Sequence, residues 1–416
     1  MKRTAVPILG QSQTARSVLE REHEPVRSLY IHVPFCFHKC HYCDFYSVVG
    51  DESRHEQFVR ALLRELEALA PHAGVLDTIF IGGGTPTILS VEQWERILLL
   101  LYRHYRLRDG CEFTVECNPE TATPELMATL AQSGVNRLSV GAQSFDPRHL
   151  KTLERWHEPA NVQRALALAA EAGIERRSVD LIFGIPGQTM DEWLDDLARA
   201  CDLSPSIGHI SCYALTVEMD TALAERIRLG DMAPPDEDLQ ARMYEATVVF
   251  LRERGFSRYE VSNFAKSGLG GGPSEHNLAY WRQRSWLAAG PGAAAHVRGG
   301  GSSWRFRNVP HLRHWGEGAS DGGFVPVTDV EPPDGQRLAR EVLMTGVRLA
   351  EGVDLDGPDL AELDGAARWA IAREAERLVL IGEATLVGSR LCLTNIGFLH
   401  ADSIAADLMA CVGAGD

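Results

Sequence analysis

The chain lacks any long apolar run. No stretch approaches the roughly 20 apolar residues that a membrane-spanning helix needs. The apolar stretch nearest the start, Ala5 to Leu9, is too short for a signal-peptide core and contains Pro7. We therefore expect a cytoplasmic protein with at most peripheral membrane contact. Residues 1–27 are mixed and polar, and we expect a flexible N-terminal arm there.

Positive charge is also scarce. The 416 residues carry 41 Lys plus Arg against 57 Asp plus Glu, a formal net charge of -16. Such a chain repels phosphate backbones, so we expect no nucleic-acid partner. The hydrophobic fraction of 45% is that of a globular protein, and the length suits two or three domains.

A disulfide framework is a third absence. The nine cysteines are odd in number and too sparse for the scaffold of a small secreted protein. Six of them are scattered through apolar surroundings, and we expect them to be buried small hydrophobes in a reducing compartment. The other three, Cys36, Cys40 and Cys43, are crowded together and need a separate explanation.

Short apolar, β-branched runs alternate with helical periodicities after residue 27, the pattern of βαβ units around a parallel sheet. The predicted strands are Leu29–Val33, Thr78–Ile81, Phe113–Glu116, Arg137–Val140, Ser178–Phe183 and His209–Leu215. The predicted helices are Glu56–Ala70, Val91–Tyr105, Pro124–Gln132, Val162–Ala172 and Met190–Leu203. The predicted fold class is α/β, a partial (β/α)6 TIM-like barrel.

The composition predicts four segments. Residues 1–27 form the arm, 28–265 the barrel, 266–330 a linker rich in glycine and serine, and 331–416 a smaller C-terminal domain. That last segment is expected to be a winged-helix-like α+β domain. Its predicted elements are helices over 335–349 and 360–380, a hairpin across Gly388-Ser389 and a final helix after Asn395.

Chemically unusual residues fall at the C-terminal end of each predicted strand, where α/β barrels build their sites. In chain order they are Cys36, Gly82 to Thr85, Glu116, Gln143, Asp180, Tyr213 and Ala214. Six contributing strands favour a barrel over a single crevice in an open sheet.

The cysteine triplet has the spacing CxxxCxxC. Three thiolates on one loop can hold three irons of a [4Fe-4S] cluster and leave the fourth iron open for chemistry. The alternative is a structural zinc site with His38 or His41 as fourth ligand, although such sites usually use two separated ligand pairs. Spacing alone favours the cluster.

Tyr30-Ile31-His32-Val33-Pro34-Phe35 ahead of this triplet resembles the radical S-adenosylmethionine family, in the branch around oxygen-independent coproporphyrinogen oxidase. The resemblance implies an open [4Fe-4S] cluster on the three cysteines, with S-adenosylmethionine bound to its open iron. It implies that Gly83, Gly84 and Thr85 contact the methionyl part and that Glu116 takes the ribose hydroxyls. The remaining cofactor-binding residues that it implies are Tyr30, Gln143, Arg155, Asp180 and Ala214.

Two outcomes within this branch differ in function. True oxidases carry a further cysteine two residues after the triplet, where this chain has Phe45. His276-Asn277-Leu278-Ala279-Tyr280-Trp281 matches the HNxxYW motif of heme chaperones that resemble the oxidase. The resemblance therefore implies heme as bound cargo, with His276 as its axial ligand and heme-acceptor proteins as partners.

Other expectations follow from this resemblance. An electron donor such as a flavodoxin or ferredoxin and a homodimer are further expected partners, and Arg305, Arg307 or Arg348 would offset the heme propionates. The alternative function is oxidative decarboxylation of coproporphyrinogen III to protoporphyrinogen IX. A remoter alternative is a zinc-binding structural protein. Without the resemblance, the HNxxYW segment would be interpreted as a structural element in which Tyr280 and Trp281 hold a domain interface.

Overall fold

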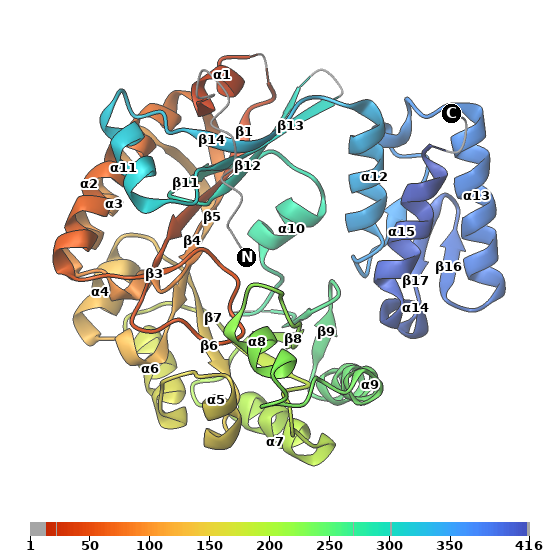
Figure 1. The fold of residues 1–416 in the computed structure, drawn as a ribbon, viewed down its shortest axis with the longest axis horizontal. Coiled ribbons are helices and arrows are strands. Elements are labelled where there is room, and N and C mark those ends of the chain that lie inside the picture. Colours follow the sequence, from red (N-terminus) through yellow and green to blue (C-terminus); the bar gives the residue numbers. More distant parts are fainter. Residues whose placement is uncertain (1–13, 22, 269, 300–301, 414–416) are drawn as a thin grey trace.

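The computed structural model of the chain describes residues 14–21, 23–268, 270–299 and 302–413. All six predicted strands are present and form adjacent parallel neighbours in one sheet. They are β1 (Val26–Val33), β4 (Ala73–Gly83), β5 (Arg106–Cys117), β6 (Arg137–Gln143), β7 (Arg176–Phe183) and β8 (His209–Ala214). This confirms the predicted fold class (Figure 1).

Additional strands extend both edges of this sheet. β11 (Leu287–Ala289) pairs with β1 in parallel, whereas β10 (Asn263–Lys266) and β9 (Phe256–Arg258) are antiparallel beyond β8. The edge strands β11 and β9 do not pair, so the barrel stays open.

Four of the six strands, β1, β4, β5 and β7, begin earlier than predicted, and β4 and β5 do so by the most residues. β4 begins at Ala73 and β5 at Arg106, and these extensions pair Val75 with Arg106 and Leu76 with Leu107. The extensions are mixed in polarity and partly exposed, so no hydrophobic run reveals them in the sequence.

The five predicted helices follow the strands and cover the outside of the sheet. They are α2 (Glu52–Leu69), α3 (Val91–His104), α4 (Pro124–Gln132), α6 (Pro159–Glu171) and α7 (Met190–Cys201). Side chains cap the N-termini of α2, α3, α4 and α7, and Ser90 and Thr189 form reciprocal capping boxes with Gln93 and Glu192. α2 begins four residues before the prediction because the Asp51 carboxylate accepts a hydrogen bond from the Arg54 amide.

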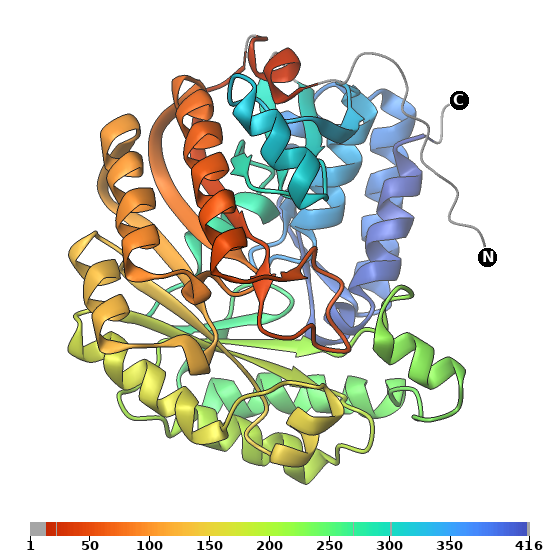
Figure 2. The ribbon, with the colours of Figure 1, turned by 60° about the vertical axis from the view of Figure 1, so that its left-hand side comes forward.

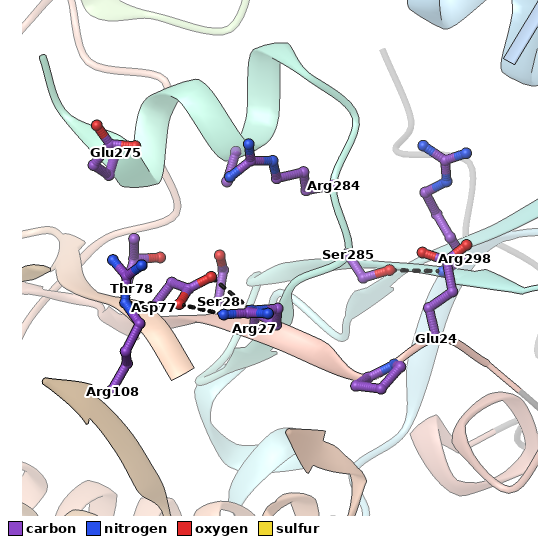
Figure 3. Close-up of a pocket in the computed structure, with 12 residues that line it drawn as sticks. Glu24, Arg27, Ser28, Asp77, Thr78, Arg108, Glu275, Arg284, Ser285 and Arg298 are labelled. Atoms are coloured by element: carbon purple, nitrogen blue, oxygen red, sulfur yellow. Dashed lines mark hydrogen bonds and ion pairs between the residues drawn. The ribbon is translucent and has the colours of Figure 1, made fainter. Parts of the chain in front are cut away.

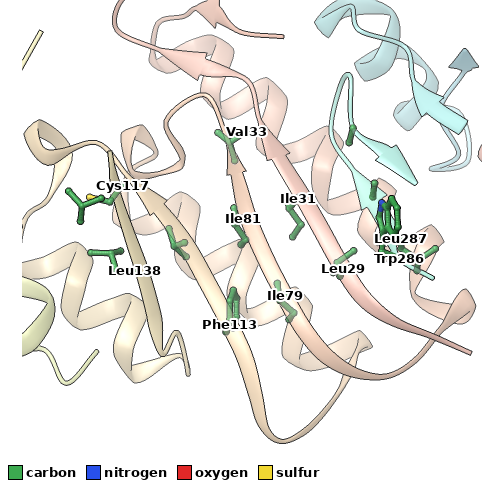
Figure 4. Packing of buried hydrophobic residues seen from close by; sticks show 14 of the residues in the cluster. Leu29, Ile31, Val33, Ile79, Ile81, Phe113, Cys117, Leu138, Trp286 and Leu287 are labelled. Carbon is green, nitrogen blue, oxygen red and sulfur yellow. The ribbon is translucent and has the colours of Figure 1, made fainter. Parts of the chain in front are cut away.

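Alternate residues of the central strands divide the barrel into a core and a lumen. Leu29, Ile31, Ile79, Ile81 and Phe113 are buried in the main hydrophobic core (Figure 4). The residues between them point to the opposite face, because side chains alternate along a strand. Polar side chains of the other face therefore line the lumen.

Three further helices lie in the connections that follow β6 and β8. They are α5 (Pro147–Thr152), α8 (Ala222–Arg228) and α9 (Glu237–Glu253). In α9, Met243, Thr247 and Leu251 are buried, and the Thr247 hydroxyl accepts a hydrogen bond from the Trp193 indole of α7. α9 therefore packs against α7 and extends the helical cover.

The segment 266–330, predicted as a linker, contains regular structure. It holds α10 (Glu275–Trp281), β11, β12 (Ala294–Gly299), β13 (Ser302–Asn308), α11 (Leu312–Ser320) and β14 (Val327–Glu331). Strands β12, β13 and β14 form an antiparallel sheet of their own. Buried Phe306 and Trp315 join this segment to the main core, which glycine and serine content alone does not indicate.

Part of the predicted flexible arm is a helix. Residues 1–13 of that arm lie outside the described residues. Ala15–Leu19 forms α1, whose Ala15, Val18 and Leu19 are buried in the main core. The arm prediction is therefore wrong for this stretch, because three apolar side chains at helical spacing anchor it.

The C-terminal elements form the predicted small winged-helix-like domain, seen at the right of Figure 1. Their order is α12 (Gly335–Gly346), β15 (Val353–Asp354), α13 (Gly365–Leu380), β16 (Ala384–Val387), β17 (Arg390–Leu393), α14 (Asn395–Leu399) and α15 (Ala401–Cys411). α13 begins five residues after the prediction because Asp364 caps it by accepting from the Ala367 amide. The predicted final helix is two helices, α14 and α15. Across the described residues, every helix is too short or too polar to span a bilayer.

Candidate functional site

The C-terminal ends of the six parallel strands surround a cavity of about 420 Å³, which we call the cysteine cavity. It is lined by every residue that the sequence predicts for the site except Tyr30 and His276: Cys36, Cys40, Cys43, Gly83, Gly84, Thr85, Glu116, Gln143, Arg155, Asp180 and Ala214. Residues spread over nearly 180 positions of sequence thus meet at one end of the sheet. The structure thus brings these residues together in one cavity, and their binding roles stay predictions.

The cysteine loop leaves the barrel through a short strand pair. β2 (Phe35–Cys36) runs parallel to β3 (Val48–Val49), and the loop between them carries Cys40 and Cys43. Burial raises the pKa of the Cys36 thiol, and it raises that of Cys43 to about 11. Thiols with such pKa values ligate at neutral pH only where a cation stabilises the thiolate.

Two protein cations, Lys39 and Arg155, line the cysteine cavity beside these thiols. The Arg155 guanidinium is 3.9 Å from the Cys40 sulfur and donates a hydrogen bond to the Gly141 carbonyl at 3.2 Å. Arg155 is partly buried, so its charge is less screened than on the surface and favours negative charge on the cysteine sulfurs.

The glycine loop after β4 packs closely against its neighbours. A Cβ on Gly83, whose φ is +110°, would lie 2.5 Å from the His32 ring. A Cβ on Gly84 would lie 2.6 Å from the Phe35 carbonyl oxygen and 3.0 Å from the Cys36 sulfur. Both positions therefore require glycine.

The amides of this glycine loop are satisfied inside the protein. Gly83 N–H donates to Glu116 at 2.9 Å, Gly84 N–H to the Val33 carbonyl at 2.8 Å and Thr85 N–H to the Phe35 carbonyl at 2.7 Å. A ligand in the cavity would therefore find these three amides already engaged.

Two buried acids face the cavity from β5 and β7. Burial raises the pKa of Glu116 to about 8, with the nearby Asp180 adding to the shift. Burial also raises the pKa of Asp180, although a hydrogen bond from the Ser139 hydroxyl acts in the opposite direction. That hydroxyl lies 3.1 Å from both Asp180 carboxylate oxygens. Glu116 is therefore poised to donate or accept a hydrogen bond with a polar ligand near neutral pH.

Three large, exposed apolar side chains line the cysteine cavity or neighbour residues that line it. Phe37, Phe45 and Trp156 are 64%, 62% and 67% exposed, and the His38 ring stacks on Trp156 with centroids 4.3 Å apart. Phe45 itself lines the cavity. Phe45, which stands where the oxidases have a further cysteine, thus places an aromatic ring in the lining of the cavity.

Tyr30 and His276 lie deeper in the lumen. The Tyr30 hydroxyl is 2.9 Å from His32 Nδ1, and its ring is 6.5 Å from that of His276. Tyr30 therefore supports the residue that packs beneath Gly83 and does not line the cavity itself.

His276 is fully buried, and both of its ring nitrogens are occupied. Nδ1 is 2.8 Å from the Thr78 hydroxyl and Nε2 is 2.8 Å from the Tyr280 hydroxyl. The buried Glu112 carboxylate holds the start of α10 by accepting from the amides of Glu275 and His276. In this arrangement His276 is not available to a heme iron, and its role as heme ligand stays a prediction.

A second cavity, of about 430 Å³, lies beneath α10 and shares no lining residue with the cysteine cavity (Figure 3). Arg27 and Arg108 both pair with Asp77 there, while Glu275 and Arg284 face them from the α10 segment. Its charges largely cancel within the protein.

The three arginines expected to offset heme propionates are already engaged. Arg305 pairs with Glu341 at 3.0 Å, Arg307 donates to the Gly292 carbonyl at 3.1 Å, and Arg348 pairs with Asp402 at 2.5 Å. None of them lines the cysteine cavity. The structure therefore gives no support to these three as propionate partners.

Several lining residues are absent from the sequence prediction. Tyr42, Ser139 and Glu218 line the cysteine cavity, and Ser139 also contacts Asp180. A serine inside a strand carries no motif, but the alternation along Arg137–Val140 would place Ser139 on the lumen face with Asp180 opposite.

Comparison with known proteins shows the superfamily and the fold of the chain. The Radical SAM superfamily model matches residues 30–200. The solved structure of coproporphyrinogen III oxidase HemN from Escherichia coli, a radical SAM enzyme, aligns with a TM-score of 0.78 over 94% of this chain and 92% of that chain, at 21% identity. The fold is therefore shared with HemN, and the chain belongs to the radical SAM superfamily.

Two curated relatives show the family within this superfamily to which the chain belongs. Heme chaperone HemW from Mycobacterium tuberculosis H37Rv is 37% identical over 389 residues, 92% of this chain and 94% of the relative. Heme chaperone HemW from Bacillus subtilis is 35% identical over 331 residues, 79% of this chain and 85% of the relative. Within the superfamily, the chain belongs to the HemW family.

Proposed function

We propose that this chain is a cytoplasmic heme chaperone that binds heme and delivers it to acceptor proteins. The observation that carries the proposal is its 37% identity to a heme chaperone across 92% of the chain. Phe45, at the position where oxidases have a further cysteine, supports the same function. We further propose a homodimer and an electron donor of the flavodoxin or ferredoxin type as partners.

We propose that Cys36, Cys40 and Cys43 hold an open [4Fe-4S] cluster. The three thiols line one cavity with Arg155, whose charge favours thiolates. A zinc ion bonded at about 2.3 Å would draw the sulfurs to within about 4 Å of one another. Among the described residues, only Asp146, His149 and Glu192 place three ligand atoms within 4.8 Å of one another, so the three cysteine sulfurs are not gathered as tightly as a zinc ion would hold them.

S-adenosylmethionine would occupy the rest of the cysteine cavity. When bound, the cluster and this cofactor supply one-electron chemistry. Glu116 holds the Gly83 amide with Oε2, which leaves Oε1 for ribose hydroxyls. Asp180, Gln143 and Ala214 would then surround the remainder of the bound cofactor.

Gly84→Ala is expected to lower the S-adenosylmethionine affinity by about tenfold or more, because its Cβ would collide with the Phe35 carbonyl beside Cys36. Isothermal titration of the reconstituted protein measures this loss. Gly365→Ala is the matched control, since a Cβ there meets no atom within 4 Å. Equal affinities for wild type and Gly84→Ala would contradict the loop's proposed role.

Two anaerobic assays on the reconstituted protein separate chaperone from oxidase. We expect heme to bind with one heme per chain and coproporphyrinogen III to remain unconverted. Conversion to a vinyl product without heme binding would establish the oxidase alternative, which the HemN-like fold accommodates.

A further inference from the structure

Two hydroxyl groups approach the sulfur of Cys36, the first of the three clustered thiols. The cysteines lie on the loop between β1 and α2, which is red-orange in Figure 2. Ser47 and Thr85 line the cysteine cavity together with this loop. The ligand set of three thiols uses neither hydroxyl.

The Thr85 hydroxyl donates a hydrogen bond to the Cys36 sulfur at 3.7 Å. Thr85 stands at the N-cap of the short 3-10 helix Pro86–Ile88, where a threonine side chain usually accepts from an amide of the helix. It forms no such cap here, and the residue is only 3% exposed. The hydroxyl is therefore directed to the sulfur and away from the helix.

The Ser47 hydroxyl is a buried group without a hydrogen-bond partner in the described part of the chain. Burial raises the pKa of the Cys36 thiol, and the nearby hydroxyls of Thr85 and Ser47 both lower it. Ser47 therefore lies close to the sulfur. Because a buried hydroxyl without an acceptor destabilises a fold, its place beside Cys36 is best explained by an acceptor that forms when the thiolate does.

Backbone hydrogen bonds hold both hydroxyl-bearing segments against the residues that precede Cys36. Thr85 N–H donates to the Phe35 carbonyl at 2.7 Å, and Val48 N–H donates to the Pro34 carbonyl at 2.7 Å. The pairing of β2 with β3 then sets Val48 opposite Phe35, with Ser47 just before it. Both hydroxyls are thus preorganised beside the sulfur.

The other two cysteines have donors of a different kind. The Cys40 sulfur faces the Arg155 guanidinium at 3.9 Å. Burial raises the pKa of Cys43, and the Phe45 amide lowers it. Hydroxyls at Cys36 complete an arrangement in which each sulfur has a donor of its own.

We propose that the Ser47 and Thr85 hydroxyls donate hydrogen bonds to the Cys36 sulfur of the cluster and raise its reduction potential, a proposal that rests on the proposed cluster. Reduction adds one electron, which the proposed flavodoxin or ferredoxin supplies, and no proton moves. The added negative charge is shared with the cysteine sulfurs, so a donor to Cys36 stabilises the reduced form more than the oxidised form. Both residues act through Cys36 and are positioning residues.

Potentiometric titration of the reconstituted full-length protein, followed by the EPR signal of the reduced cluster, tests these hydroxyls without S-adenosylmethionine. Ser47→Ala and Thr85→Val each remove one hydroxyl and nearly preserve the side-chain volume. At a fixed potential, the ratio of reduced to oxidised cluster should fall by about threefold in each variant. In the double variant it should fall by about tenfold, which is about 59 mV for one electron.

Three control variants separate the hydroxyl from side-chain packing. Thr85→Ser keeps the hydroxyl and should keep the wild-type midpoint potential. Ser303→Ala removes a buried, unpartnered hydroxyl on β13, and Thr87→Val removes a buried hydroxyl that bonds to Thr121. Both should also titrate as wild type does.

A wild-type midpoint potential in either Ser47→Ala or Thr85→Val would overturn the proposal, as would an equal shift in Ser303→Ala and Thr87→Val. Loss of the cluster from Ser47→Ala or Thr85→Val would show a purely structural role and would overturn it as well. Failure of wild type to assemble any cluster would instead remove the proposed cluster itself.

Discussion

Cys40→Ser is expected to leave a folded chain that holds no [4Fe-4S] cluster after anaerobic reconstitution with iron and sulfide. Serine does not ionise near neutral pH, so Arg155, which lies 3.9 Å from the Cys40 sulfur, would face a neutral hydroxyl instead of a thiolate. With two thiolates remaining, a cubane lacks a third protein ligand. Iron and sulfide content and the visible absorption of the cluster measure the loss.

Cys392→Ser is the control for this experiment. Cys392 lies on β17 in the C-terminal domain, where its thiol contacts the Glu351 carbonyl at 3.2 Å. This variant should retain a full cluster. A normal cluster in Cys40→Ser, or an equal loss in both variants, would refute the proposed ligand set.

Glu65→Ala is expected to lower the free energy of unfolding by about 3–5 kcal/mol. The Glu65 carboxylate accepts from the Gly290 amide, the Asn308 side chain and the Trp315 indole, at 2.7, 2.7 and 2.9 Å. Each buried donor left without an acceptor costs about 1–3 kcal/mol, and the truncation adds a cavity. Chemical denaturation measures the change, with the exposed Glu67→Ala on the same helix as control. A loss below about 1 kcal/mol would show that these contacts do not join α2 to α11.

The raised pKa of Glu65 also predicts that the free energy of unfolding depends on pH. Burial raises its pKa from 4.5 to about 8, so the folded state favours the protonated acid. Its contribution to stability is therefore complete below about pH 4.5 and is lost as the pH rises through about 8. Relative to Glu65→Gln, which does not titrate, wild type should lose unfolding free energy between about pH 5 and about 8. A constant difference across that range would contradict the raised pKa.

The sequence predicts the barrel well because strand alternation and strand-end chemistry are local signals. Cys36, Gly83 and Glu116 each directly follow or end an apolar run, so their meeting at one edge of the sheet follows from parallel topology. The boundaries of β4 and β5 are less predictable, since their early residues are stabilised by pairing with each other and carry no hydrophobic pattern.

The sequence cannot predict features that arise from distant contacts. His276 stands in a recognisable motif, but its burial between Thr78 and Tyr280 depends on how α10 enters the lumen. Glu65 resembles a surface acid, and only the positions of Asn308 and Trp315 show that it is buried.

Heme transfer tests the chaperone proposal most directly. Heme-loaded protein is mixed with a heme-free acceptor that has a distinct Soret band, and in parallel with a scavenger that captures only released heme. The account predicts that transfer to the acceptor is faster than release to the scavenger and that its rate rises with acceptor concentration. Equal rates in the two reactions, or a protein that takes up no heme, would contradict it.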